Sequence, residues 1–191
     1  MLNSISRSAF LRLEWALSLA LVALALGWAE VRDLPLGRPW TLGPRELSAG
    51  AAAGALLWLC IPLLRRSPAI RRLWDGVLVP FARGLRTGDI VAIALLSGVS
   101  EELLFRGVLL PEIGIVASSA LFGALHALTP LYALWAGLTG AGFALLTIHG
   151  SLTTAIVAHA VYNAGALFAL RHWPVRAPAA RSAADEIGVG R

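Results

Sequence analysis

Long apolar stretches are the feature that most constrains the fold of this 191-residue chain. Blocks close to the length of a membrane span recur between Phe10 and Leu170, separated by short polar segments. The hydrocarbon core of a bilayer is about 30 Å thick, and about 20 apolar helical residues cross it. A backbone in lipid must satisfy its own hydrogen bonds, so such blocks form helices. The chain is therefore predicted to be an all-α, polytopic membrane helical bundle.

Composition agrees with this class and excludes others. The chain is 58% hydrophobic and 14% charged, with a mean hydropathy of +0.74, whereas a soluble domain mixes polar and apolar residues more evenly. All 16 basic residues are arginine. They lie beside apolar blocks and form no separate basic face, so we expect the lipid bilayer as a partner and no nucleic acid. The single cysteine, Cys60, can form no intrachain disulfide.

We expect six spans and one interfacial helix. Residues 65–89 carry six arginines and apolar residues at helical spacing, which is typical of an amphipathic helix in the membrane interface. Pro80 is expected to end or bend it. The first span should be a retained signal anchor and not a cleaved signal peptide. The spans are predicted at residues 10–31, 48–64, 90–110, 113–128, 130–148 and 151–170.

The spans predict one integral membrane domain over residues 1–171, with its catalytic core at about residues 90–170 and a flexible tail over residues 172–191. Arginines gather before the first span, in the loop 65–89 and in the tail, whereas the outer loop 32–47 holds three. By the positive-inside rule, both termini are expected in the cytoplasm of a multi-pass protein of the inner (plasma) membrane.

Ionisable side chains stand inside the third span. Glu101, Glu102 and Arg106 lie in a run that is otherwise apolar. Each such group costs roughly 2.5 to 3.5 kcal/mol to insert at the membrane centre, so intramembrane charges usually mark a functional site.

Three spans carry a pair of candidate residues four positions apart. These pairs are Glu102 with Arg106, Phe122 with His126, and His159 with Asn163. Residues four apart lie on one face of a helix, so each pair can face a common interior point.

The residue types suit activation of a water molecule. A carboxylate in an apolar site can act as a general base, imidazoles can orient water or carry its proton, and a histidine with an amide can stabilise an oxyanion. Other readings stay open. Glu102 and Arg106 are more plausibly a structural ion pair that tunes Glu101, a lone histidine is often only hydrogen bonded, and Phe122 is expected to be a wall of the site.

Together these motifs resemble the CPBP (CAAX protease and bacteriocin-processing, or ABI) family of intramembrane proteases, to which the type II CAAX prenyl endopeptidases belong. The motifs are Glu101-Glu102-x-x-x-Arg106, Phe122-x-x-x-His126 and His159-x-x-x-Asn163. The resemblance covers about residues 97–170.

The resemblance implies a glutamic-type intramembrane endopeptidase. It would cut a peptide bond near the C-terminus or membrane anchor of a membrane-associated protein or peptide. By the resemblance, Glu101 would activate water with help from His126, His159 and Asn163 would stabilise the oxyanion, and Glu102 and Arg106 would support the site. No cofactor is expected; zinc held by Glu101, His126 and His159 is the alternative, since two histidines and a carboxylate can ligate it.

The chain is shorter than eukaryotic members of this family, and its arginine usage suggests a bacterial source. Whether prenylated CAAX substrates are used therefore stays open. One competing hypothesis is a non-catalytic membrane protein for bacteriocin self-immunity or scaffolding. Another is a proton-coupled transporter, although the sequence shows no repeated half of the kind that many transporters contain.

Overall fold

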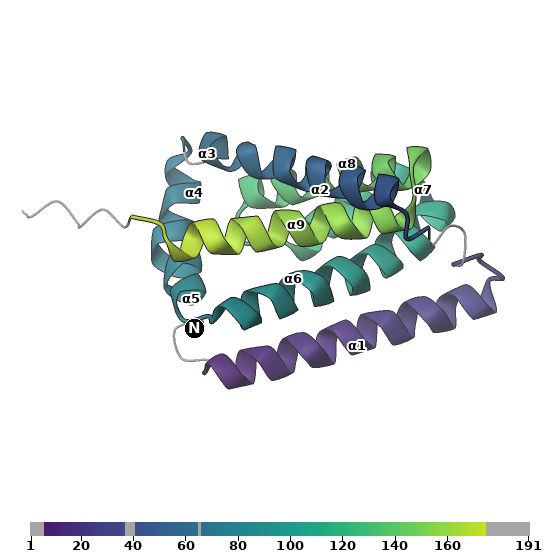
Figure 1. Cartoon of the computed structure of the whole chain (residues 1–191), viewed down its shortest axis with the longest axis horizontal. Helices are drawn as coiled ribbons and strands as arrows, with labels where there is room; N and C mark the ends of the chain where they lie inside the picture. Colours follow the sequence, from purple (N-terminus) through teal and green to yellow (C-terminus); the bar gives the residue numbers. More distant parts are fainter. Residues whose placement is uncertain (1–5, 37–40, 65, 175–191) are drawn as a thin grey trace, which may run out of the picture.

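The computed structural model describes residues 6–36, 41–64 and 66–174, and helices make up almost all of them (Figure 1). The predicted tail and the middle of the loop 32–47 lie mostly outside these residues. The elements are α1 (Arg7–Val31), α2 (Pro44–Leu59), α3 (Ile61–Leu64), α4 (Pro68–Leu73), the π-helical turn η2 (Trp74–Leu78), α5 (Val79–Arg83), α6 (Thr87–Glu102), the π-helical turn η3 (Leu103–Leu109), α7 (Leu110–Leu125), α8 (Pro130–His149) and α9 (Leu152–Arg171).

Five helical stretches of the described chain are long and apolar enough to cross a membrane. The all-α membrane bundle is thus confirmed, but the third and fourth predicted spans fall in one stretch, Thr87–Leu125. This stretch folds back on itself, because the rings of Phe105 and Phe122 lie 5.0 Å apart. In a straight helix, residues 17 positions apart would be separated by about 26 Å.

The chain reverses at Gly114, whose backbone angles are φ 76° and ψ 174°. This conformation is essentially restricted to glycine. The returning limb, residues 115–125, has a helical length of only about 16 Å. The fourth predicted span, which was expected to reach residue 128, is therefore too short to cross the membrane alone.

Small residues allow α2 and α9 to pack closely. A Cβ atom at Gly50 would lie 2.7 Å from the carbonyl oxygen of Thr154, and one at Gly54 would lie 2.5 Å from that of Ala158. In lipid, where apolar side chains gain little by leaving their solvent, such close contact is a main source of helix association. The two glycines, one helical turn apart in Gly50-x-x-x-Gly54, thus form the face of α2 that contacts α9.

Helix α1 lies at the edge of the bundle, beside α6 (Figure 1). An ion pair ties it down near each end: Arg7 binds Asp89 at the start of α6, and Arg32 lies 3.1 Å from Glu112 in α7. Between these pairs, Ala25 and Ala29 are buried against the bundle while most larger side chains face outward.

The segment from α4 to α5 crosses one end of the bundle (Figure 1). Ile70, Trp74 and Val79 are buried in a cluster with Leu170 of α9, whereas Arg71 and Arg72 are exposed. This amphipathic arrangement agrees with the expected interfacial helix. Pro80 does not end the helix, which continues to Arg83; its irregularity is the π-helical turn just before Pro80.

Replacing Gly114 by alanine should destabilise the fold without creating a clash. No atom lies within 4 Å of a Cβ built at this position, so only the backbone conformation opposes the change. The expected loss is about 1–3 kcal/mol, measured as a lower midpoint of thermal unfolding in detergent. Gly142→Ala in α8 is the matched control, because it too has open space and has no positive φ. Equal midpoints for the two variants would contradict the role of Gly114.

Candidate active site

A buried carboxylate joins three helices at the centre of the bundle. Glu102 is completely buried, and its Oε1 accepts hydrogen bonds from Arg106 Nη1 at 3.0 Å and from His159 Nδ1 at 2.7 Å. Arg106 also donates from Nη2 to the carbonyl oxygen of Gly140 in α8, at 2.7 Å. The predicted i, i+4 ion pair is therefore present. It is part of a larger network, because Glu102 also binds His159 and Arg106 also binds the backbone of Gly140.

The site begins where α6 passes into the π-helical turn η3, directly after Glu102. Such turns are rare and occur frequently at functional sites. The side chain of the preceding residue, Glu101, points away from Arg106 and His159. It is partly buried and takes no part in the contacts of Glu102.

Aromatic rings and a glycine enclose the Arg106 guanidinium. Its central carbon lies 4.6 Å from the ring centroid of Phe122 and 5.5 Å from that of Phe143, which suits a cation–π interaction. A Cβ at Gly140 would lie 2.9 Å from Arg106 Nη2. Glycine at this position leaves the room that the arginine needs.

The imidazole of His159 is held from two sides. Its ring stacks on that of Phe143, with centroids 4.9 Å apart and planes 13° apart. Because a carboxylate can only accept hydrogen bonds, the N–H of this bond lies on His159 Nδ1 and points at Glu102. Its Nε2 is then the atom left to contact a substrate.

Glu101 and His126 face one another across the turn at Gly114. Glu101 Oε2 lies 3.7 Å from His126 Nε2, and the two side chains remain 18% and 34% exposed. His126 Nδ1 donates to the carbonyl oxygen of Phe122 at 2.8 Å. In a neutral ring Nε2 therefore carries a lone pair, so that two acceptors face each other at a distance too long for a direct hydrogen bond.

Phe122 packs at the centre of the site, buried among Phe105, His126 and His159. It therefore does more than form one wall. Its ring contacts both the Arg106 guanidinium, 4.6 Å from the centroid, and the His126 ring, 4.4 Å between centroids, and its carbonyl oxygen orients His126.

Asn163 lies one turn after His159 and is oriented by a residue that sequence reasoning missed. Its Nδ2 donates to the hydroxyl of Ser97 in α6, at 2.9 Å. An amide nitrogen has two protons, so one remains for another acceptor. Ser97 stands four residues before Glu101, and only this helical spacing could have singled it out.

One cavity of about 320 Å³ brings most of these residues together. Glu101, Phe122, His126, His159 and Asn163 all line it, whereas Glu102 and Arg106 lie behind its wall. The sequence did not single out several of its other lining residues, Glu14, Ser97, Tyr132, Trp135 and Tyr162. Of these, Glu14 could have been found, because it is an acidic residue inside an apolar block, as Glu101 is.

The described side chains do not fit a resident metal ion. No group of three or more histidine, cysteine, aspartate or glutamate side chains among them is placed to hold one. The carboxylate nearest to His159 is that of Glu102, which already binds Arg106.

Comparison with protein families matches residues 84–165 to the family described as Type II CAAX prenyl endopeptidase Rce1-like. The matched segment contains all seven site residues named from the sequence, and it confirms the resemblance on which that assignment rested. Comparisons with curated proteins and with solved structures gave no match. Residues 84–165 thus form an Rce1-like domain of the CPBP family, which indicates an intramembrane protease of the CAAX type.

Proposed function

We propose that this protein is an intramembrane endopeptidase in which Glu101 activates the attacking water. The observation that carries the proposal is the pair of acceptors, Glu101 Oε2 and His126 Nε2, 3.7 Å apart in a cavity. Glu101 Oε2 is buried and has no hydrogen-bond donor among the described residues. A single water molecule can donate one proton to each acceptor, and this would place its oxygen beside both.

The proposed reaction proceeds by general base catalysis. Glu101 removes a proton from the water as the water oxygen bonds to the carbonyl carbon of the substrate, and the carbonyl oxygen becomes an oxyanion. Glu101 then returns the proton to the amide nitrogen as the carbon–nitrogen bond breaks. The products are a new carboxyl terminus and a free amine.

The oxyanion would be stabilised from α9. Asn163 has a proton on Nδ2 that Ser97 does not use. A doubly protonated His159 would donate from Nδ1 to Glu102 and from Nε2 to the oxyanion. Donors fixed in a site shielded from water stabilise such charge far better than mobile solvent does.

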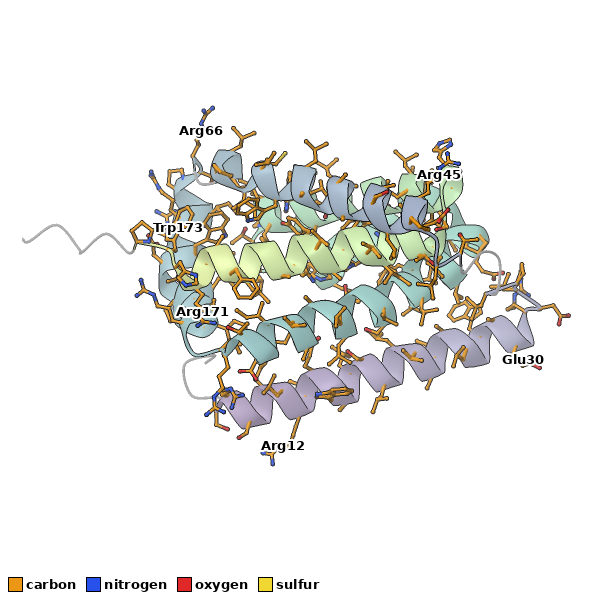
Figure 2. The ribbon with its side chains drawn as sticks, in the orientation of Figure 1. Arg12, Glu30, Arg45, Arg66, Arg171 and Trp173 are labelled. Carbon is orange, nitrogen blue, oxygen red and sulfur yellow. The ribbon has the colours of Figure 1, made fainter. Side chains whose placement is uncertain are left out.

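The substrate is proposed to be a membrane-associated protein, cut near its C-terminus or membrane anchor. Arginines mark one end of the bundle, where Arg12, Arg66 and Arg171 are found, while Glu30 and Arg45 lie at the other (Figure 2). We infer from the positive-inside rule that the first end and both termini face the cytoplasm, in a bacterial plasma membrane.

Glu101→Gln should lower cleavage at least about a hundredfold, because removal of a general base typically has effects of this size. The measurement is co-expression with candidate membrane proteins from the same gene neighbourhood, followed by mass spectrometry of trimmed C-termini. Glu46→Gln, at the start of α2 and outside the cavity, is the matched control. Full biological activity of the Glu101→Gln protein would instead favour a non-catalytic immunity or scaffolding role.

Glu102→Gln should reduce stability as well as activity, unlike the change at Glu101. It leaves the buried Arg106 guanidinium without its carboxylate, and breaking a buried ion pair costs about 3–5 kcal/mol. Thermal unfolding of purified protein in detergent should show a lower midpoint for Glu102→Gln and a nearly unchanged one for Glu101→Gln. Similar midpoints for both variants would remove the distinction drawn between these glutamates.

Zinc chelation should leave the cleavage rate unchanged, because the proposed water activation uses Glu101 and His126 without a metal. The test compares purified enzyme before and after prolonged treatment with a zinc-specific chelator. Loss of activity that added zinc restores would replace this mechanism with the metal-dependent alternative.

A further inference from the structure

Helix α1 contributes a carboxylate to the cavity. Glu14 and Phe10 are four residues apart, lie on one face of α1 and both line the cavity that holds Glu101. Glu14 is partly buried, although it stands in a span whose larger side chains mostly face outward. A carboxylate inside a membrane span is costly to insert, so Glu14 is expected to have a function, as the intramembrane glutamates of α6 are.

No described side chain neutralises Glu14. None of the hydrogen bonds and ion pairs among the described side chains involves Glu14, and the charged group that acts on it is another carboxylate, Glu101, in the same cavity. Arg7, on the same helix, binds Asp89. Arg12 points away from the bundle (Figure 2).

The lining that the described residues give the cavity includes no arginine or lysine side chain, and its two histidines, His126 and His159, already contact Glu101 and Glu102. The buried Arg106 is bound to Glu102 behind the wall. The surface around Glu14 and Glu101 is instead aromatic, aliphatic or neutral and polar: for example, Trp135 donates to the hydroxyl of Tyr162 at 2.8 Å. Two carboxylates in such surroundings are electrostatically complementary to a cationic group that enters from outside.

The cavity also extends toward the end of the bundle from which a cation would arrive. Phe81 of α5 and Leu170 near the end of α9 line it, and both belong to the arginine-marked end. The ring of Phe81 packs against that of Phe10, with centroids 4.5 Å apart. Membrane segments carry lysine and arginine at their cytoplasmic flanks, so a substrate bound with its flank at this end brings a cation close to Glu14.

We propose that Glu14 determines substrate specificity by binding a lysine or arginine side chain close to the cleaved bond. This rests on the proposed function, because it assigns the substrate class of the same cavity. Glu14 touches none of the reacting atoms in this scheme. It favours substrates with a basic residue over those with a neutral one.

Binding can be tested without cleavage. The probes are dodecanoyl-arginine amide and its neutral isostere dodecanoyl-citrulline amide, titrated into the full-length protein in phosphatidylcholine nanodiscs. The wild type should bind the arginine probe about tenfold more tightly, equivalent to ~1.4 kcal/mol. Glu14→Gln should bring the ratio close to one. Glu30→Gln, which removes an exposed carboxylate from the far end of α1, should keep the wild-type ratio.

Equal binding of the two probes by the wild type, or an unchanged preference in Glu14→Gln, would overturn the assignment. Cleavage of a library of membrane-inserted peptides separates this result from the proposed function. Cleavage without enrichment of basic residues at any fixed position contradicts the role of Glu14 and leaves the protease intact. A Glu14-dependent probe preference without hydrolysis supports the cation site and contradicts the protease.

Discussion

The arrangement of the bundle interior depends on the shared carboxylate of Glu102. A charge in this position is tolerated only when partners replace its lost hydration, and Glu102 has two, Arg106 and His159. Through them it connects α6 and η3 with α9, and the contact of Arg106 with Gly140 adds α8. The glycine at 140 and the rings around the guanidinium are consequences of this requirement.

Two adjacent glutamates consequently have opposite environments. Successive helical residues are about 100° apart around the axis, so when Glu102 faces Arg106 and His159, Glu101 faces the cavity and His126. The first carboxylate is fully bonded at one oxygen and inaccessible. Each carboxylate keeps one oxygen without a donor among the described residues, but Glu101 lines the cavity and Glu102 does not. One glutamate thus holds the helices together, and its neighbour is the one that we propose as the general base.

Local patterns made much of this predictable. Apolar length identified all the spans except the fourth, which is too short to cross alone, and i, i+4 spacing identified the Glu102–Arg106 pair, because both signals depend on residues close in sequence. The partners of that pair on α8 and α9 were not predictable, since no local pattern specifies which helices become neighbours. The break between the third and fourth predicted spans was expected at residues 111–112, whereas the chain reverses at Gly114, because a glycine in an apolar stretch does not reveal its φ. Ser97 was overlooked because its contact with Asn163 exists only when α9 packs beside α6. Glu14, an acidic residue inside an apolar block, carried a sequence signal, but its place in the cavity depends on the packing of α1.

The turn at Gly114 also has a consequence for the order in which the site is assembled during synthesis. Glu101 and His126 are brought together by a local hairpin, whose closure requires few intervening residues and little loss of chain entropy. His159 and Asn163 belong to α9, which leaves the ribosome later and must then pack against α2 and α6. The acid–imidazole pair can therefore form early on a nascent chain, while the groups facing it from α9 arrive last. A ribosome-bound intermediate that lacks α9 is consequently incomplete at this site.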